Sequence, residues 1–437
     1  MAKVRVTKAL SISNGVAIMI DELPHVPPAL ILLYEELAGE ESWSAKRKKL
    51  KGMIKELRDQ SEGFFEYQID NARKDESFSG FEVHLNGEMD LLTDSGCQEL
   101  PCRVAAAERI SRSMGLIADR VWMTDLLTER FMDFGRVTND KLDYILEDLM
   151  VLFTLFPLIV GGIVKFRTPW LVSCQSCASD FYAQIEYTSE ILSKEFKSEF
   201  KLEKIDNGFK AYVGACVEPP IILTGFDQKK PKKMDFVRSW VSEQVRSAFW
   251  TAREASFTGG AVVSNSRIGL AGLLQSDGHH VDRSSIKLLD SERDFSVPWV
   301  SKLSPGQILE LRQEASQALP LFREKMFQIM SGTTYAGKTA SEQILELRDQ
   351  AAQVKSELKT TQKNSAKYWK TTYGMLGLGL SAYGVATDQV LPGVGGLLPI
   401  LQLLIGHKSG HDQKVDSQLN KPGYVLVKAQ DILAHAH

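Results

Sequence analysis

Residues Gly332–Thr339 read GTTYAGKT and match the phosphate-loop pattern, in which four residues separate a glycine from Gly-Lys-Thr. In such a loop, backbone N–H groups surround the phosphates, the lysine contacts the β- and γ-phosphates, and the last hydroxyl binds magnesium. A nucleotide site would therefore consist of Gly332, Gly337, Lys338 and Thr339.

The surroundings of this loop favour a structural role. A phosphate loop follows a strand, whereas Leu321, Phe322, Met326 and Ile329 have the spacing of a helix. Residues 339–342 read T-x-x-E, a capping box that begins a helix. We therefore expect a turn between two helices here, with the nucleotide site as the alternative.

Four cysteines fall into two close pairs, Cys97 with Cys102 and Cys174 with Cys177. Four thiolates can hold a zinc ion in a tetrahedral site, although the two pairs lie far apart in the sequence. Two other interpretations stay open. Cys174-Gln-Ser-Cys177 at the start of a predicted helix could be a redox dithiol, or the cysteines could be small structural side chains. An odd total of five cysteines is typical of reduced thiols in the cytoplasm.

The histidines offer one further cluster, at residues 277–280, which read DGHH. Asp277, His279 and His280 could ligate a metal, but such a stretch is more often a solvated loop. The sequence contains neither H-E-x-x-H nor G-x-S-x-G, the motifs of zinc proteases and of many hydrolases. These observations lean against an enzyme.

A basic stretch, KKPKK at residues 229–233, precedes a predicted helix that carries Arg238, Arg246 and Arg253 among aromatic residues. Cations mixed with aromatic side chains suit single-stranded nucleic acid, but an amphipathic helix with an aromatic core face is the preferred interpretation. The basic helix over residues 46–58 is likewise expected to be a solvated face. A net charge of -3 argues against a general nucleic-acid binder.

Residues 374–406 form an apolar, glycine-rich segment that Asp388 and Pro392 interrupt. Neither apolar piece reaches the roughly 20 residues that a spanning helix needs. The segment could pack inside the core, insert into a membrane as a hairpin, or serve a partner or self-association.

In the segments that must position these residues, the apolar side chains mostly have the spacing of helices. Alternation around Asn86-Gly87 predicts a hairpin near residues 80–95. The motifs QILELRQEASQA and QILELRDQAAQV form a near repeat of two helices. We expect an α-rich α+β fold with three parts: a helical N-terminal domain (1–160), a mixed strand and helix domain (161–300), and a helical C-terminal region with the repeat and the apolar tail (301–437).

The expected function is a non-enzymatic cytoplasmic interaction or regulatory protein, such as a stress or defence effector whose C-terminal apolar hairpin touches a membrane. A protein partner or self-association is expected, and nucleic acid is not. The alternative is a phosphate-handling or metal-dependent enzyme that uses Lys338 and Thr339 or the Cys and His clusters.

Overall fold

The computed structural model describes most of the chain outside its N-terminus, several loops and the long segment 359–417. The described residues are 10–11, 17–18, 23–71, 80–93, 98–169, 174–205, 208–213, 221–224, 232–258, 260–264, 266–276, 299–330, 342–343, 345–358 and 418–435. Contacts divide the chain into two units: Met1–Arg293 with Ser304–Gly306, and Asp294–Leu303 with Gln307–His437. The chain is mostly helical and contains a mixed α/β part, as the sequence predicts.

The first unit contains a four-stranded sheet in the order β5-β4-β3-β9, and every neighbouring pair is parallel. The strands are β3 (Glu82–Asn86), β4 (Arg120–Thr124), β5 (Val164–Arg167) and β9 (Ala261–Ser264). Consecutive connections run from β3 to β4 to β5, and the chain then returns to place β9 on the other side of β3. β4 and β5 pair across the boundary expected at residue 160.

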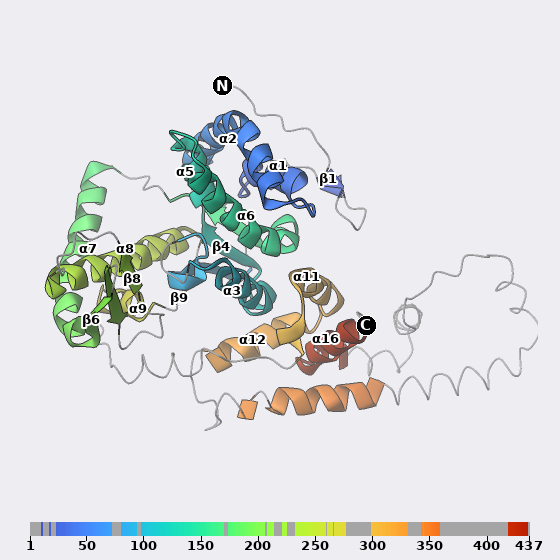
Figure 1. The fold of residues 1–437 in the computed structure, drawn as a ribbon. Helices are drawn as coiled ribbons and strands as arrows, with labels where there is room; N and C mark the ends of the chain where they lie inside the picture. The colour runs from blue at the N-terminus through green and yellow to red at the C-terminus, as the bar shows by residue number, and fades with distance from the viewer. Residues whose placement is uncertain are drawn as a thin grey trace, which may run out of the picture. The chain divides into compact units, whose positions relative to one another are not determined.

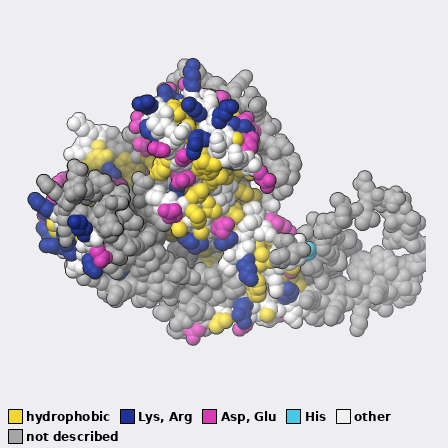
Figure 2. All heavy atoms as spheres, in the orientation of Figure 1, with side chains coloured by type: hydrophobic (Ala, Val, Ile, Leu, Met, Phe, Trp, Pro, Cys, Tyr) yellow, Lys and Arg dark blue, Asp and Glu magenta, His cyan; other side chains and the backbone are white. Residues whose placement is uncertain are grey.

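Helices precede this sheet and fill its connections from β3 to β5, and they form much of the core of the unit (Figure 1). They are α1 (Pro28–Leu37), α2 (Trp43–Asn71), α3 (Leu100–Arg112), α4 (Met114–Ile117), α5 (Leu126–Met132) and α6 (Asn139–Val160). Apolar residues recur along α6, so this helix is buried over most of its length. In the space-filling view, lysine and arginine side chains gather where Figure 1 places α2 (Figure 2). Lys48, Lys49, Lys51 and Lys55 of α2 are exposed, as expected for a solvated basic face, whereas Lys46 is buried and donates to the Leu37 and Gly39 carbonyls.

The predicted hairpin near residues 80–95 is wrong. β3 ends at Asn86 and continues into a 3-10 turn, Gly87–Met89, and both neighbours of β3 are parallel strands. A two-residue hairpin of the Asn-Gly type needs positive φ at both residues. Gly87 has a φ of 69°, but Asn86 stays extended with a φ of -144°, so the chain does not reverse.

A second cluster in the same unit contains α7 (Gln175–Phe196), α8 (Lys233–Thr258) and α9 (Arg267–Ser276). An antiparallel sheet of β6 (Phe200–Ile205), β7 (Gly208–Val213) and β8 (Ile221–Thr224) accompanies them. Their core includes Val237, Val241, Val245 and Phe249 of α8, so the aromatic core face predicted for this helix is confirmed. Figure 1 shows α8 running from this cluster to the parallel sheet.

The second unit contains η4 (Val300–Lys302), α11 (Pro305–Glu314), α12 (Leu319–Met330), a helix at residues 345–358 and α16 (Gly423–His435). The two helices of the near repeat bury matching residues: Leu311 and Ala315 in the first, Leu347 and Ala351 in the second. In the part of the chain that the structure describes, no helix is long and apolar enough to cross a membrane.

Candidate functional site

One face of the parallel sheet carries mostly polar side chains, with Val262 of β9 as an apolar exception. In-register residues of parallel strands point to the same side. That side carries Glu82, His84, Asn86, Arg120, Trp122, Thr124, Lys165, Arg167 and Ser264. The opposite side carries Val83, Leu85, Val121, Met123, Val164 and Phe166. Parallel sheets are usually apolar on both faces, so the polar face is where this unit concentrates its chemistry.

At the carboxyl ends of the strands, Asp90 and Arg167 form a buried ion pair with 2.6 Å between Arg167 Nη2 and Asp90 Oδ2. Both side chains are 3% exposed. Asp90 also accepts hydrogen bonds from the Thr124 backbone N–H at 3.0 Å and from its hydroxyl at 2.6 Å. Arg167 donates to the carbonyls of Leu85 at 2.7 Å and Trp122 at 2.8 Å. The ion pair therefore ties together the ends of three neighbouring strands.

The strand order reverses between β3 and β9, where open α/β sheets usually bind their ligands. Here Asn86 occupies that position. Its amide donates to the hydroxyls of Ser247 at 2.8 Å and Thr251 at 3.1 Å on α8, and its carbonyl accepts from Ser264 at 2.7 Å. Side chains of α8 thus fill the place of a ligand, and this edge of the sheet is closed.

His84 lies in the middle of the polar face and is 1% exposed. Its Nε2 lies 2.9 Å from the Thr258 hydroxyl, and its ring stacks on Trp122 with centroids 5.6 Å apart. Burial, and secondarily the charge of Arg167, lowers the pKa of His84 to about 2. The imidazole is therefore neutral near pH 7, and its pKa lies far below the value near 7 that suits a general acid or base.

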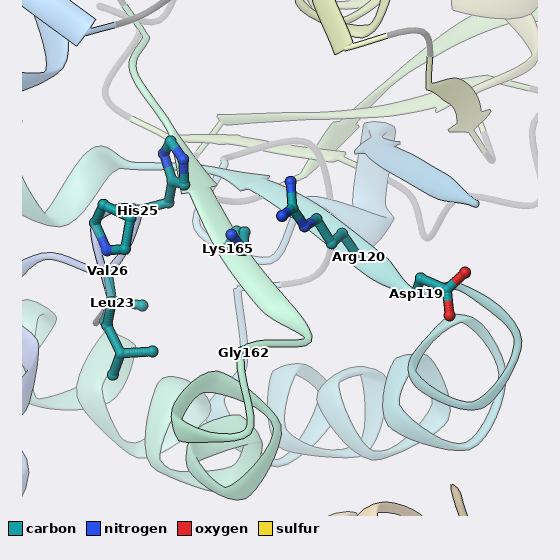
Figure 3. Close-up of a pocket in the computed structure, with 8 residues that line it drawn as sticks. Leu23, His25, Val26, Asp119, Arg120, Gly162 and Lys165 are labelled. Carbon is teal, nitrogen blue, oxygen red and sulfur yellow. The ribbon is translucent and has the colours of Figure 1, made fainter. Parts of the chain in front are cut away.

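The open part of the polar face is a pocket of about 230 Å³ at the amino ends of β4 and β5. In Figure 3, Arg120 and Lys165 extend from the two strands beside His25. The arginine pairs with Glu82 at 3.0 Å, and Asp119 accepts a hydrogen bond from the Phe81 N–H at 2.9 Å. Since carboxylates balance its cations, the pocket has no strong preference for an anion.

The structure separates the cysteines predicted to bind zinc. Cys102 lies in the first turn of α3, while Cys174 and Cys177 begin α7. No three His, Cys, Asp or Glu side chains among the described residues lie together as metal ligands do, so Cys102 does not join the other two. Cys97 lies outside the described residues.

Most of the other predicted site residues also lie outside the described part of the chain: Gly332, Gly337, Lys338 and Thr339 of the loop, and the DGHH cluster at residues 277–280. The element that leads into the loop is nevertheless visible. It is helix α12, which ends at Met330, as its spacing predicts. A phosphate loop follows a strand, whereas the element before this motif is a helix.

In the second unit, α16 is held against both repeat helices. The Gly423 N–H donates to the Gln350 side chain at 2.9 Å, and Lys355 contacts Gln430. Lys428, which is buried, forms an ion pair with Glu314 of α11 at 3.0 Å. The chain on either side of residues 359–417 is thereby anchored in one unit.

Sequence reasoning missed the polar face because β3 was read as half of a hairpin. A signal existed, since Asn86, Thr124, Arg167 and Ser264 each end a short run of strand-forming residues. Comparison with protein-family models, with curated proteins and with solved structures finds no match to this chain.

Proposed function

We propose that this chain is a non-enzymatic interaction or regulatory protein that works at a membrane surface, as an effector in stress or defence would. The second unit presents the apolar segment 374–406 to the lipid. The first unit binds a protein partner or a second copy of this chain. The proposed location is the cytoplasm, at the membrane. In this proposal, the N- and C-terminal parts of the chain are helical and flank a smaller part that mixes strands and helices.

The docking of α16 carries this proposal. Gln350 and Lys355 hold α16 from one side of residues 359–417, and Gly423 and Gln430 belong to α16 on the other. The chain therefore leaves this folded unit before the apolar segment and re-enters the same unit after it. A loop tethered at both ends can enter a bilayer only as a hairpin, which agrees with the two short apolar pieces on either side of Asp388.

The residues before the apolar segment support membrane binding by their composition. Between residues 358 and 374 all charged side chains are lysines: Lys359, Lys363, Lys367 and Lys370. Tyr368, Trp369 and Tyr373 stand among and after them. Aromatic side chains favour the interface of a bilayer, and each lysine near an anionic surface contributes about 1 kcal/mol.

The closed edge of the parallel sheet supports a role other than catalysis for the first unit. Asp90, Arg167 and Asn86 occupy the usual place of catalytic groups in such sheets, but Asp90 and Arg167 bind each other, Arg167 also binds backbone carbonyls, and Asn86 binds α8. Their arrangement stabilises the sheet and leaves its surface for a partner.

Vesicle flotation tests the proposal. The full chain is mixed with phosphatidylcholine vesicles with or without phosphatidylserine, and so is a variant in which a Gly-Ser linker of equal length replaces 374–406. The linker keeps α16 in place, which truncation before the segment would not. We expect the wild-type chain to float with anionic vesicles and the linker variant to stay in the dense fraction.

A second pair of variants tests whether vesicle binding depends on the basic stretch before the apolar segment or on the positive charge of the protein in general. Replacement of Lys363, Lys367 and Lys370 by Gln is expected to reduce flotation with anionic vesicles by at least about tenfold. The matched control replaces Lys48, Lys49 and Lys51, exposed lysines of α2, and leaves flotation unchanged. Equal flotation of the wild-type chain and the linker variant, or no flotation of either, would overturn the proposal.

A further inference from the structure

Cys174 and Cys177 form an exposed pair of thiols at the beginning of α7. Their positions differ by three, about one helical turn, a spacing that brings side chains to about 5–6 Å between Cβ atoms. A disulfide needs Cβ atoms about 3.5–4.5 Å apart, so an adjustment of about 1–2 Å within the first turn is enough to join the two sulfurs.

Cys174 occupies the N-cap position of a helix of 22 residues, and the Cys177 N–H points at Cys174 Sγ at 3.5 Å. Helix N-termini stabilise negative charge because unpaired N–H groups and the helix dipole face it. The hydrogen bond from the Cys177 N–H, followed by that from the Cys177 thiol, lowers the pKa of Cys174. Cys174 is therefore the more nucleophilic thiol near pH 7.

The pKa of the second thiol, Cys177, is shifted in the opposite direction. Its hydrogen bond to Cys174 and the charge on that sulfur raise the pKa of Cys177, and Asp180 adds to this while Arg253 opposes it. Arg253 is held over the rings of Phe181 and Phe257, at 5.7 and 5.6 Å from their centroids. The two cysteines thus have different environments. Cys174 is suited to attack as a thiolate, and Cys177 stays a protonated thiol.

We propose that Cys174 and Cys177 are a redox-active dithiol that exchanges with a small disulfide of the glutathione class. The Cys174 thiolate attacks one sulfur of the disulfide, forms a mixed disulfide and releases one thiolate, which takes a proton from water. Cys177 then loses its proton to water and attacks Cys174 Sγ, which expels the second thiolate. Two electrons pass from the protein to the small disulfide, which leaves as two thiols.

The test uses the full chain, reduced and then exposed to oxidised glutathione, with peptide mass spectrometry as the readout. In the wild-type chain, Cys174 and Cys177 are expected to join in one disulfide. In Cys177→Ser the reaction is expected to stop at a glutathione adduct on Cys174. In Cys174→Ser, Cys177 is expected to react no faster than Cys102.

Cys102 is the matched control because it is also an exposed cysteine in the first turn of a helix. At pH 7 we expect Cys174 to react with iodoacetamide at least about fivefold faster than Cys102, since the thiolate is the reactive form. Equal rates at the two residues, or a stable glutathione adduct in the wild-type chain, would overturn the proposal. So would a purified chain whose pair holds stoichiometric zinc that blocks alkylation until a chelator removes it.

Discussion

Gly423 lies so close to Ala351 that a Cβ atom at position 423 would come within 2.7 Å of the Ala351 backbone nitrogen. This contact joins the beginning of α16 to the second helix of the near repeat. Real Cβ atoms do not approach backbone this closely, so only glycine allows the two elements to meet in this way.

Replacement of Gly423 by Ala is therefore expected to lower the free energy of unfolding of the second unit by about 1–3 kcal/mol. Denaturant unfolding and limited proteolysis after residue 418 measure the effect. Gly306→Ala is the matched control, because a Cβ atom there meets nothing within 4 Å. If both variants unfold at the same denaturant concentration, α16 is not packed as described.

Arg167 is expected to be the most sensitive charged residue of the first unit. Arg167→Met leaves Asp90 buried without its cation and removes the donors to the Leu85 and Trp122 carbonyls. Loss of one partner of a buried ion pair costs about 3–5 kcal/mol. Chemical denaturation gives the value, and a loss below about 1 kcal/mol would contradict the role of this pair as the tie between strand ends.

Asp125 makes the stability of the first unit depend on pH. It is fully buried as the N-cap of α5, where desolvation raises its pKa to about 6 despite hydrogen bonds from Thr128 and Gln68. Because the folded pKa exceeds that of the unfolded chain, stability is fully present below about pH 4 and falls as pH rises to about 6, by about 3 kcal/mol. In Asp125→Asn this decline is expected to disappear from denaturation curves taken between pH 4 and 7.

His84 acts in the opposite direction. Burial lowers its pKa to about 2, so the folded chain keeps the imidazole neutral where the unfolded chain protonates it. Its contribution is present above about pH 6.5 and is lost as pH falls. Comparison of His84→Gln with the wild-type chain from pH 7 to 4 is expected to show a weaker acid destabilisation in the variant; parallel curves would contradict this.

Helices were predictable from the sequence because their patterns are local. The spacing of Leu321, Phe322 and Met326 predicted α12, and the near repeat predicted two helices that bury equivalent residues, Leu311 and Leu347. The parallel sheet was not predictable in the same way. β3 pairs with β4 and β9, which both lie far downstream in the chain, and no local pattern specifies such partners.

In the candidate site, too, local features were predictable from the sequence and long-range contacts were not. The pair at Cys174 and Cys177 was visible from its spacing, and its place at a helix start followed from local periodicity. The Asp90–Arg167 contact was not visible, because it joins a residue that follows β3 to the last residue of β5, far along the chain. The asymmetry between the two cysteine thiols likewise depends on the position of one backbone N–H.

Hydrogen–deuterium exchange of the full chain, with and without vesicles that contain phosphatidylserine, tests the central claim most directly. The account predicts that vesicles slow exchange in residues 374–406, while exchange in α16 and in the helix at 345–358 stays unchanged because both remain docked. Unchanged exchange in 374–406 at saturating vesicles would contradict the proposed role of this segment at the membrane.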